Sequence, residues 1–93
     1  MKNIYRKGRR LEWLVRHQLE AEGFTVIRSA GSKGPVDLVA LNGREVRLIQ
    51  VKAFGAVRAA DAEALRVVKA PRSVKRQIWE RTPAGWNVST LGR

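Results

Sequence analysis

The sequence predicts an α/β sandwich in which a helix, three strands, a second helix and two strands follow one another, in the order αβββαββ. Three observations predict it. Apolar residues recur at helical spacing near the start, an Asn-Gly pair separates two apolar runs, and an Ala- and Leu-rich segment precedes two β-rich runs. With 93 residues, of which 44% are hydrophobic, the chain can bury one modest core. We therefore expect a single domain over residues 1–93 with a mixed sheet.

The first helix is predicted over residues 7–22, and Gly23 ends it. Its apolar arc consists of Leu11, Leu14, Val15 and Leu19. Trp13 and His17 lie outside this arc, so we expect both side chains at the surface.

Three predicted strands follow, at residues 24–29, 36–41 and 45–52. Turn-forming residues at 30–35 separate the first two strands, and Asn42-Gly43 separates the last two. Asn-Gly between apolar runs is the strongest short hairpin signal. A two-residue turn at this point would place Leu41 opposite Arg44.

The last three elements are predicted from composition. The Ala- and Leu-rich segment 58–70 favours a second helix that Pro71 ends. Two β-rich runs, 74–82 and 85–91, then favour a final pair of strands around a turn at Pro83.

Charge is the strongest global signal, because 19 Lys and Arg residues against 8 Asp and Glu give a net charge of +11. Basic residues gather at 7–10 and again at 66–76. Since phosphate neutralisation dominates nucleic-acid affinity, this charge favours a nucleic-acid partner. The alternatives are a well-solvated surface, an arginine bias inherited from a GC-rich genome, or binding to a membrane surface.

Cysteine is absent, so neither a disulfide nor a thiolate metal site can hold the fold. No apolar run approaches the ~20 residues that a membrane helix needs, and no signal-peptide pattern opens the sequence. We therefore expect a cytoplasmic protein, nucleoid-associated or virus-encoded, without a membrane partner.

Three polar residues, Asp37, Gln50 and Lys52, interrupt the apolar hairpin. Strand alternation places them on one face, with Asp37 and Gln50 as diagonal neighbours. Burying such groups without partners costs several kcal/mol each, roughly 2–7 for a neutral amide. Either they pair with one another, as an ion pair of Asp37 with Lys52, or they bind something from outside. Their oxygen donors suit Mg²⁺ or Mn²⁺.

Glu12 lies at the edge of the apolar arc of the first helix, where its carboxylate can lean over the sheet. The alternative for this residue is an ordinary ion pair with Arg16, four positions further along the helix. From spacing alone the ion pair is the favoured interpretation.

The segments "GPVDLVA" (34–40) and "LIQVKA" (48–53) resemble the Asp…(Glu/Asp)-x-Lys signature of the restriction-endonuclease-like, or PD-(D/E)XK, nuclease superfamily. Over residues 6–54 the wider pattern resembles archaeal-type Holliday junction resolvases. It includes a glutamate in the first helix, "GF" before the first strand and "RSAGSKGPVD" after it. The resemblance implies a Mg²⁺-dependent endonuclease that hydrolyses phosphodiester bonds of branched DNA in recombination and repair.

The resemblance also implies roles for single residues. Metal would be held by Glu12, Asp37, Gln50 and the backbone carbonyl of Val51, with Mn²⁺ able to replace Mg²⁺. Lys52 would be the catalytic lysine, and Ser32 would contact phosphate or metal. The residues expected to contact DNA are Lys7, Arg9, Arg10, Arg28, Ser32 and Lys33.

The sequence departs from the usual family pattern at Gln50, where the family usually has glutamate, although similar nucleases with glutamine at this place exist in the superfamily. An amide oxygen is still a hard donor but brings no charge, so metal affinity should fall. Two rival interpretations therefore stand beside the resolvase. One is a related nuclease that acts on nicked, flapped or plain duplex DNA, and the other is a non-catalytic DNA-binding module with a degraded site.

A resolvase cuts two opposed strands symmetrically, whereas one chain offers only one set of candidate active-site residues. We therefore expect a two-fold homodimer, whose symmetry would match that of a four-way junction. The apolar residues considered for its contact surface are Phe54, residues 65–68 and Trp79.

Overall fold

The computed structural model describes residues 3–29 and 34–92, with side chains from residue 8 onward, and the order αβββαββ is confirmed. The helices are α1 (Asn3–Ala21) and α2 (Ala59–Arg66). The strands are β1 (Thr25–Arg28), β2 (Leu38–Leu41), β3 (Val46–Lys52), β4 (Lys75–Thr82) and β5 (Gly85–Thr90). All seven lie close to their predicted places.

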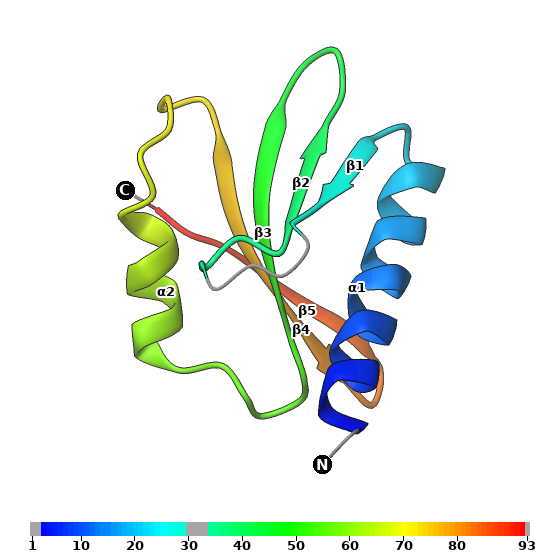
Figure 1. Cartoon of the computed structure of the whole chain (residues 1–93). Coiled ribbons are helices and arrows are strands. Elements are labelled where there is room, and N and C mark those ends of the chain that lie inside the picture. The colour runs from blue at the N-terminus through cyan, green and yellow to red at the C-terminus, as the bar shows by residue number, and fades with distance from the viewer. Residues whose placement is uncertain (1–2, 30–33, 93) are drawn as a thin grey trace.

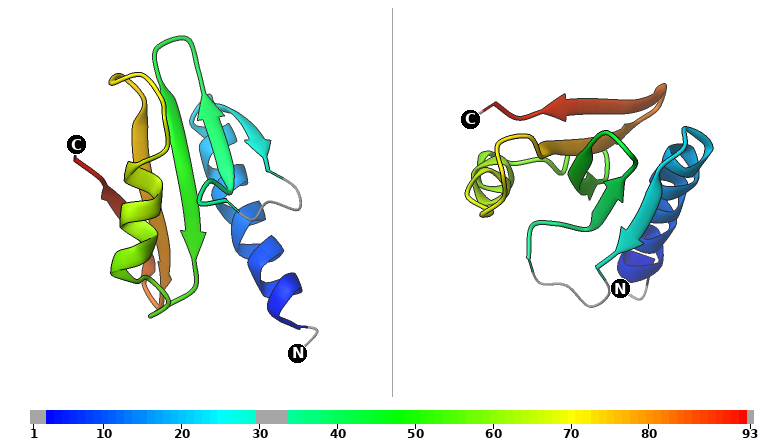
Figure 2. Two further views of the ribbon diagram at one scale, coloured as in Figure 1. Left: turned by 60° about the vertical axis from the view of Figure 1, so that its left-hand side comes forward. Right: turned by 90° about the horizontal axis from the view of Figure 1, so that it is seen from above.

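The strands form one sheet in chain order, from β1 at one edge to β5 at the other (Figure 1). Neighbouring strands are antiparallel except β3 and β4, which run parallel and are joined by a crossover through α2. The expected mixed sheet is therefore confirmed. Figure 2 shows α1 and α2 on opposite sides of the sheet.

The main core lies between α1 and the face of the sheet that α1 covers. Side chains from the helix and from alternate strand positions meet there because the two periodicities each place apolar residues on one side. The buried members are Val15, Leu19, Phe24, Val26, Leu38, Ala40, Ile49 and Trp79, with Val51 and Trp86 packed against them. Trp79 and Leu65 are both buried within the single chain, which removes them from the residues considered for a dimer contact.

Helix α1 begins four residues earlier than predicted, at Asn3, and ends before Gly23 as expected. Gly23 adopts a φ of +97°, a conformation that L side chains rarely reach. Its N–H donates to the Glu20 carbonyl at 3.0 Å, and the Phe24 N–H donates to the Leu19 carbonyl at 3.0 Å. This pair of bonds is a Schellman cap, and it turns the chain so that Phe24 enters the core.

The predicted two-residue turn between β2 and β3 is wrong. The Asn42 side-chain oxygen accepts hydrogen bonds from the backbone N–H groups of Arg44 at 2.8 Å and Glu45 at 2.9 Å. These bonds stabilise a longer turn, so that Leu41 lies opposite Val46. The register is two residues away from the predicted one, which leaves every side chain on its predicted face.

Helix α2 is shorter than predicted and ends at Arg66, well before Pro71. Val67 caps it: its N–H donates to the Glu63 carbonyl at 3.2 Å, and the Val68 N–H donates to the Leu65 carbonyl at 3.4 Å. The guanidinium of Arg76 on β4 donates to the Val68 carbonyl at 2.6 Å, which holds the chain after the helix against the sheet. In the described part of the chain, no helix is long and apolar enough to span a bilayer.

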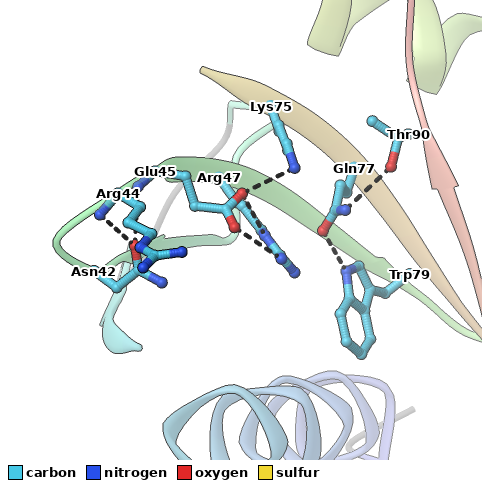
Figure 3. Close-up of polar contacts among 8 residues, drawn as sticks. All are labelled: Asn42, Arg44, Glu45, Arg47, Lys75, Gln77, Trp79 and Thr90. Carbon is cyan, nitrogen blue, oxygen red and sulfur yellow. Dashed lines mark hydrogen bonds and ion pairs between the residues drawn. The ribbon is translucent and has the colours of Figure 1, made fainter. Parts of the chain in front are cut away.

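A polar cluster joins β3 to β4 near the hairpin turn (Figure 3). Glu45 accepts hydrogen bonds from Arg47 and lies 3.1 Å from the Lys75 ammonium. Deeper in the sheet, the Gln77 amide donates to Thr90 and accepts from Trp79, both at 3.1 Å. These side chains satisfy one another.

Candidate active site

The candidate site lies where β3 extends past the start of β2. Leu38, the first residue of β2, pairs with Ile49. Among the described strands, residues 50–52 therefore have a ladder partner on β4 alone. The open edge of β3 at residues 50–52, together with Asp37 beside it, is called the notch below.

Asp37 closes the notch from the β2 side. Its N–H donates to the Ile49 carbonyl at 2.8 Å, and its carboxylate accepts the Val51 N–H at 2.8 Å. Continuing the register from Leu38 places Asp37 level with Gln50, directly opposite and not diagonal as predicted. Since the N–H and C=O of one strand residue point to the same side, the Val51 carbonyl also faces this edge.

The protonation of Asp37 reflects its surroundings. Burial raises the pKa of its carboxyl above the usual value, and the Glu12 carboxylate acts in the same direction. The hydrogen bond from Val51 and the charges of Lys52 and Arg28 act against this rise. All four groups therefore lie close enough to Asp37 to act on its charge.

Gln50 is the most unusual residue of the notch. Its side chain is 8% exposed, and its Oε1 atom has no hydrogen-bond partner among the residues that the structure describes. An unsatisfied buried amide oxygen costs about 1–3 kcal/mol. A hard cation would remove that cost, because such cations prefer oxygen donors.

Glu12 forms a different ion pair from the one that spacing favours. Its carboxylate accepts a hydrogen bond from Arg28 on β1 at 2.8 Å, whereas Arg16 pairs with Glu20 at 3.0 Å. The side chain is half-buried between α1 and the sheet. Glu12 lies near enough to Asp37 for its charge to act on that carboxyl, and the expected ion pair with Arg16 is wrong.

Lys52 pairs with α2 and does not form the ion pair with Asp37 considered from the sequence. Its ammonium lies 3.2 Å from one carboxylate oxygen of Asp61. The other oxygen of Asp61 accepts the Arg58 N–H at 2.8 Å at the start of α2. The ion pair with Asp61 therefore fixes the Lys52 ammonium beside the notch, on the side of the sheet where α2 lies.

The donor set fits a hard divalent cation. Asp37, Gln50 and the Val51 carbonyl meet at the notch, and Glu12 lies near enough to add a second negative charge. Nowhere in residues 8–29 and 34–92 do three His, Cys, Asp or Glu side chains gather in a metal-binding group. A cation in the notch would therefore depend on amide and backbone oxygens as well as on carboxylates.

The residues expected to contact DNA lie on several elements. Arg9 and Arg10 are exposed on α1, and Arg28 lies on β1 in its pair with Glu12. The side chain of Lys7 and the residues Ser32 and Lys33 fall outside the described part of the chain.

Sequence reasoning assigned Arg28 to DNA and missed its bond to Glu12, since nothing in a separation of 16 residues indicates that contact. Sequence reasoning also missed the ion pair of Asp61 with Lys52. The one available signal was that Asp61 is an acidic residue in the first turn of the predicted second helix.

The αβββαββ order and the mixed sheet place the chain in the class of the restriction-endonuclease-like fold. A model of the archaeal Holliday junction resolvase (Hjc) family matches residues 3–65, which is more than half of the chain. The chain therefore belongs to that family.

Two relatives illustrate the likeness. A curated protein of Methanocaldococcus jannaschii, the crossover junction endodeoxyribonuclease Hjc, is 52% identical over 52 residues. That alignment covers 56% of this chain and 38% of the relative, so the chain aligns with well under half of the relative's length. The solved structure of Archaeoglobus fulgidus Hjc, described as a Holliday junction resolvase from an archaeal hyperthermophile, has 29% identity and a TM-score of 0.74. The match covers 94% of this chain and 77% of that one.

Proposed function

We propose that this protein is a metal-dependent endonuclease that hydrolyses phosphodiester bonds in branched DNA, with the four-way junction as its preferred substrate. Family membership and the names of both relatives support this activity. The observation that carries the proposal is the notch, where the unsatisfied oxygen of Gln50 lies level with the half-buried Asp37 carboxylate. A net charge of +11 supplies the general attraction for DNA.

The proposed metal is Mg²⁺, with Mn²⁺ as a substitute, held by Asp37, Gln50, the Val51 carbonyl and Glu12. When bound, such an ion makes water more acidic and neutralises charge that develops on phosphate. In hydrolysis a water oxygen forms a bond to phosphorus, one P–O ester bond breaks, and the leaving oxygen takes up a proton. Lys52 would stabilise the extra negative charge on phosphate from the β3 side.

A homodimer is part of the proposal. One chain provides one notch, and two symmetric cuts in opposed strands need two. Sedimentation at moderate salt, with and without junction DNA, tests this point. A dimer in the presence of the junction is expected, and a monomer under both conditions would favour a nuclease that nicks a single strand.

The direct test uses four DNA substrates of matched sequence: a four-way junction, a flap, a nicked duplex and an intact duplex. We expect the junction to be cut first, with Mg²⁺ or Mn²⁺ and not without them. The matched control is Asp37→Asn, which keeps the size of the side chain but removes its charge. Faster cutting of flaps or nicks would identify a related nuclease with a different target. Tight binding without cutting of any substrate would identify a DNA-binding module.

A further inference from the structure

A hollow of about 270 Å³ opens beside the notch, between α1 and the first two strands. Its lining comes from one stripe of α1 together with one residue each of β1 and β2. The lining residues are Arg9, Glu12, Trp13, Arg16, Arg28 and Leu38. The α1 members share one side of the helix because they are three or four positions apart. The hollow is somewhat below the ~300–1,000 Å³ of drug-sized ligand pockets, which suits one small planar group.

Trp13 provides the flat surface of this hollow. Its side chain is 55% exposed, although tryptophan is among the residues with most apolar surface to bury. His17, one turn further along α1, lies against it with 3.9 Å between the ring centroids. This contact supports the indole from the side. An exposed aromatic ring held in place is the usual platform on which proteins stack an unpaired base.

The charges around the ring suit a phosphate. Arg16 is paired with Glu20, and Arg28 is paired with Glu12, so their charges are partly compensated. Arg9 forms no ion pair with any other residue whose side chain the structure describes. It therefore leaves one uncompensated cation at the rim of a hollow that already contains two further guanidinium groups.

The hollow adjoins the notch through two of its residues. Glu12 lines the hollow and is also one of the residues proposed to hold the metal at the notch. Leu38 lines the hollow and directly follows Asp37 in the chain. A nucleotide in the hollow would therefore be a near neighbour of a phosphate bound at the notch.

We propose that the hollow binds one unstacked nucleotide beside the cleaved phosphate, with its base on Trp13 and its phosphate on Arg9. This inference rests on the proposed action on DNA and adds how a branch point is recognised. Taking a base out of a duplex costs a few kcal/mol, and the cost is least where the base is already unpaired or poorly stacked. Bases at a crossover meet that condition. The hollow thus favours branched over continuous DNA.

The test places 2-aminopurine, one position at a time, around the branch of a four-way junction. The protein carries Asp37→Asn to prevent cutting during the measurement. We expect the fluorescence to change on binding at one or two positions next to the cut. Adding Trp13→Ala should abolish that change and weaken binding roughly 5- to 100-fold, whereas Trp13→Phe should retain part of both. Val88→Ala, an exposed apolar change on the opposite edge strand, is the control and should alter neither.

Three outcomes would overturn the inference: no position-specific signal, a signal that Trp13→Ala leaves unchanged, or a Trp13→Ala effect confined to the association state. The last would identify Trp13 as a contact between protein chains. Cleavage by the protein with Asp37 intact is measured in parallel. Normal cutting without a Trp13-dependent signal rejects the hollow alone, and a Trp13-dependent signal without cutting rejects the nuclease activity alone.

Discussion

Two buried glutamines on neighbouring strands differ in a way that separates folding from function. Gln77 on β4 is 6% exposed, and both ends of its amide are satisfied, by Thr90 and by Trp79. Gln50 on β3 is 8% exposed, and its Oε1 atom is left without a partner in the described structure. The fold therefore can satisfy a buried amide where only stability is required. An unsatisfied amide at the notch supports the proposal that a ligand from outside the chain binds there.

The carboxylates at the two ends of β3 repeat this contrast. Hydrogen bonds from Arg47 and then Lys75 lower the pKa of Glu45 near the hairpin turn. At the notch, burial raises the pKa of Asp37. The Glu45 carboxylate pairs with two cations of its own chain, whereas the Asp37 carboxylate accepts a hydrogen bond from the neutral backbone N–H of Val51.

The largest expected effect comes from Asp37→Asn. Cleavage should fall by roughly 10³-fold or more, because several kcal/mol of transition-state stabilisation depend on the ion that this carboxylate would help hold. DNA affinity should change little, since phosphate attraction is spread over many cations. Single-turnover cleavage and fluorescence anisotropy measure the two effects. A parallel loss of both would give Asp37 a structural role like that of Glu45.

Glu12 and Glu20 offer a matched pair on α1, since each binds one arginine. We expect Glu12→Ala to lower cleavage at least about 10-fold because it removes negative charge beside the notch. Glu20→Ala removes an exposed ion pair, so it should cost only about 0.3–0.5 kcal/mol of stability and leave cleavage unchanged. Initial cleavage rates decide the comparison. Equal rates for the two variants would leave Glu12 with no role beyond its ion pair with Arg28.

The two glutamines can be compared by the same substitution. Gln77→Glu should destabilise the protein by about 1–3 kcal/mol, because it replaces a satisfied neutral amide by a negative charge at a buried position. Mg²⁺ should not reverse that loss. Gln50→Glu should also destabilise the metal-free protein, but here added Mg²⁺ should restore the stability. This variant should also need a lower Mg²⁺ concentration than the unmodified protein for half-maximal cleavage. Urea denaturation with and without Mg²⁺ measures the stability. If Mg²⁺ changed the stability of both variants equally, the claim that Gln50 differs from Gln77 by binding a metal would be contradicted.

The smallest expected effects are those of pH on stability. The pKa of Glu45 is lowered in the folded state. Its contribution to the free energy of unfolding is therefore present above its unfolded-state pKa and is lost as the pH falls through its folded-state pKa. A raised pKa gives Asp37 the opposite sign, so its contribution is present at low pH and is lost as the pH rises. Between pH 3 and pH 7, Glu45→Gln should flatten the rise of unfolding free energy with pH, and Asp37→Asn should make it steeper. Denaturation midpoints measured at several pH values give the pH dependence of stability for each variant. If both substitutions changed that dependence in the same direction, the contrast between Glu45 and Asp37 would be contradicted.

The sequence predicts the fold because local signals agree with one another. The apolar spacing of α1 and the glycine after it place the helix end at the correct turn. The register of β2 and β3 could not be predicted in the same way. It depends on hydrogen bonds from two backbone N–H groups to the Asn42 side chain, which compete with the two-residue turn that Asn-Gly usually forms. The end of α2 depends on contacts with β4 that sequence alone does not contain.

The candidate site is predictable to the extent that strand alternation controls it. The shared face of Asp37, Gln50 and Lys52 follows from parity, which a shift of two residues preserves. The partners of these residues do not follow from parity. Arg28 reaches Glu12, and Asp61 reaches Lys52, through the packing of helices on the sheet. Whether the Gln50 oxygen has a partner depends on the positions of all neighbouring donors, which strand parity does not specify.

The central claim is that the notch binds a divalent cation through Asp37 and Gln50, and calorimetric titration of Mg²⁺ into the DNA-free protein tests it most directly. We expect one site per chain, tighter binding for Gln50→Glu, and no measurable binding for Asp37→Asn. Gln77→Glu, the matched change on β4, should bind like the unmodified protein. Equal Mg²⁺ affinity in Asp37→Asn and the unmodified protein would contradict the claim and leave the notch without a ligand.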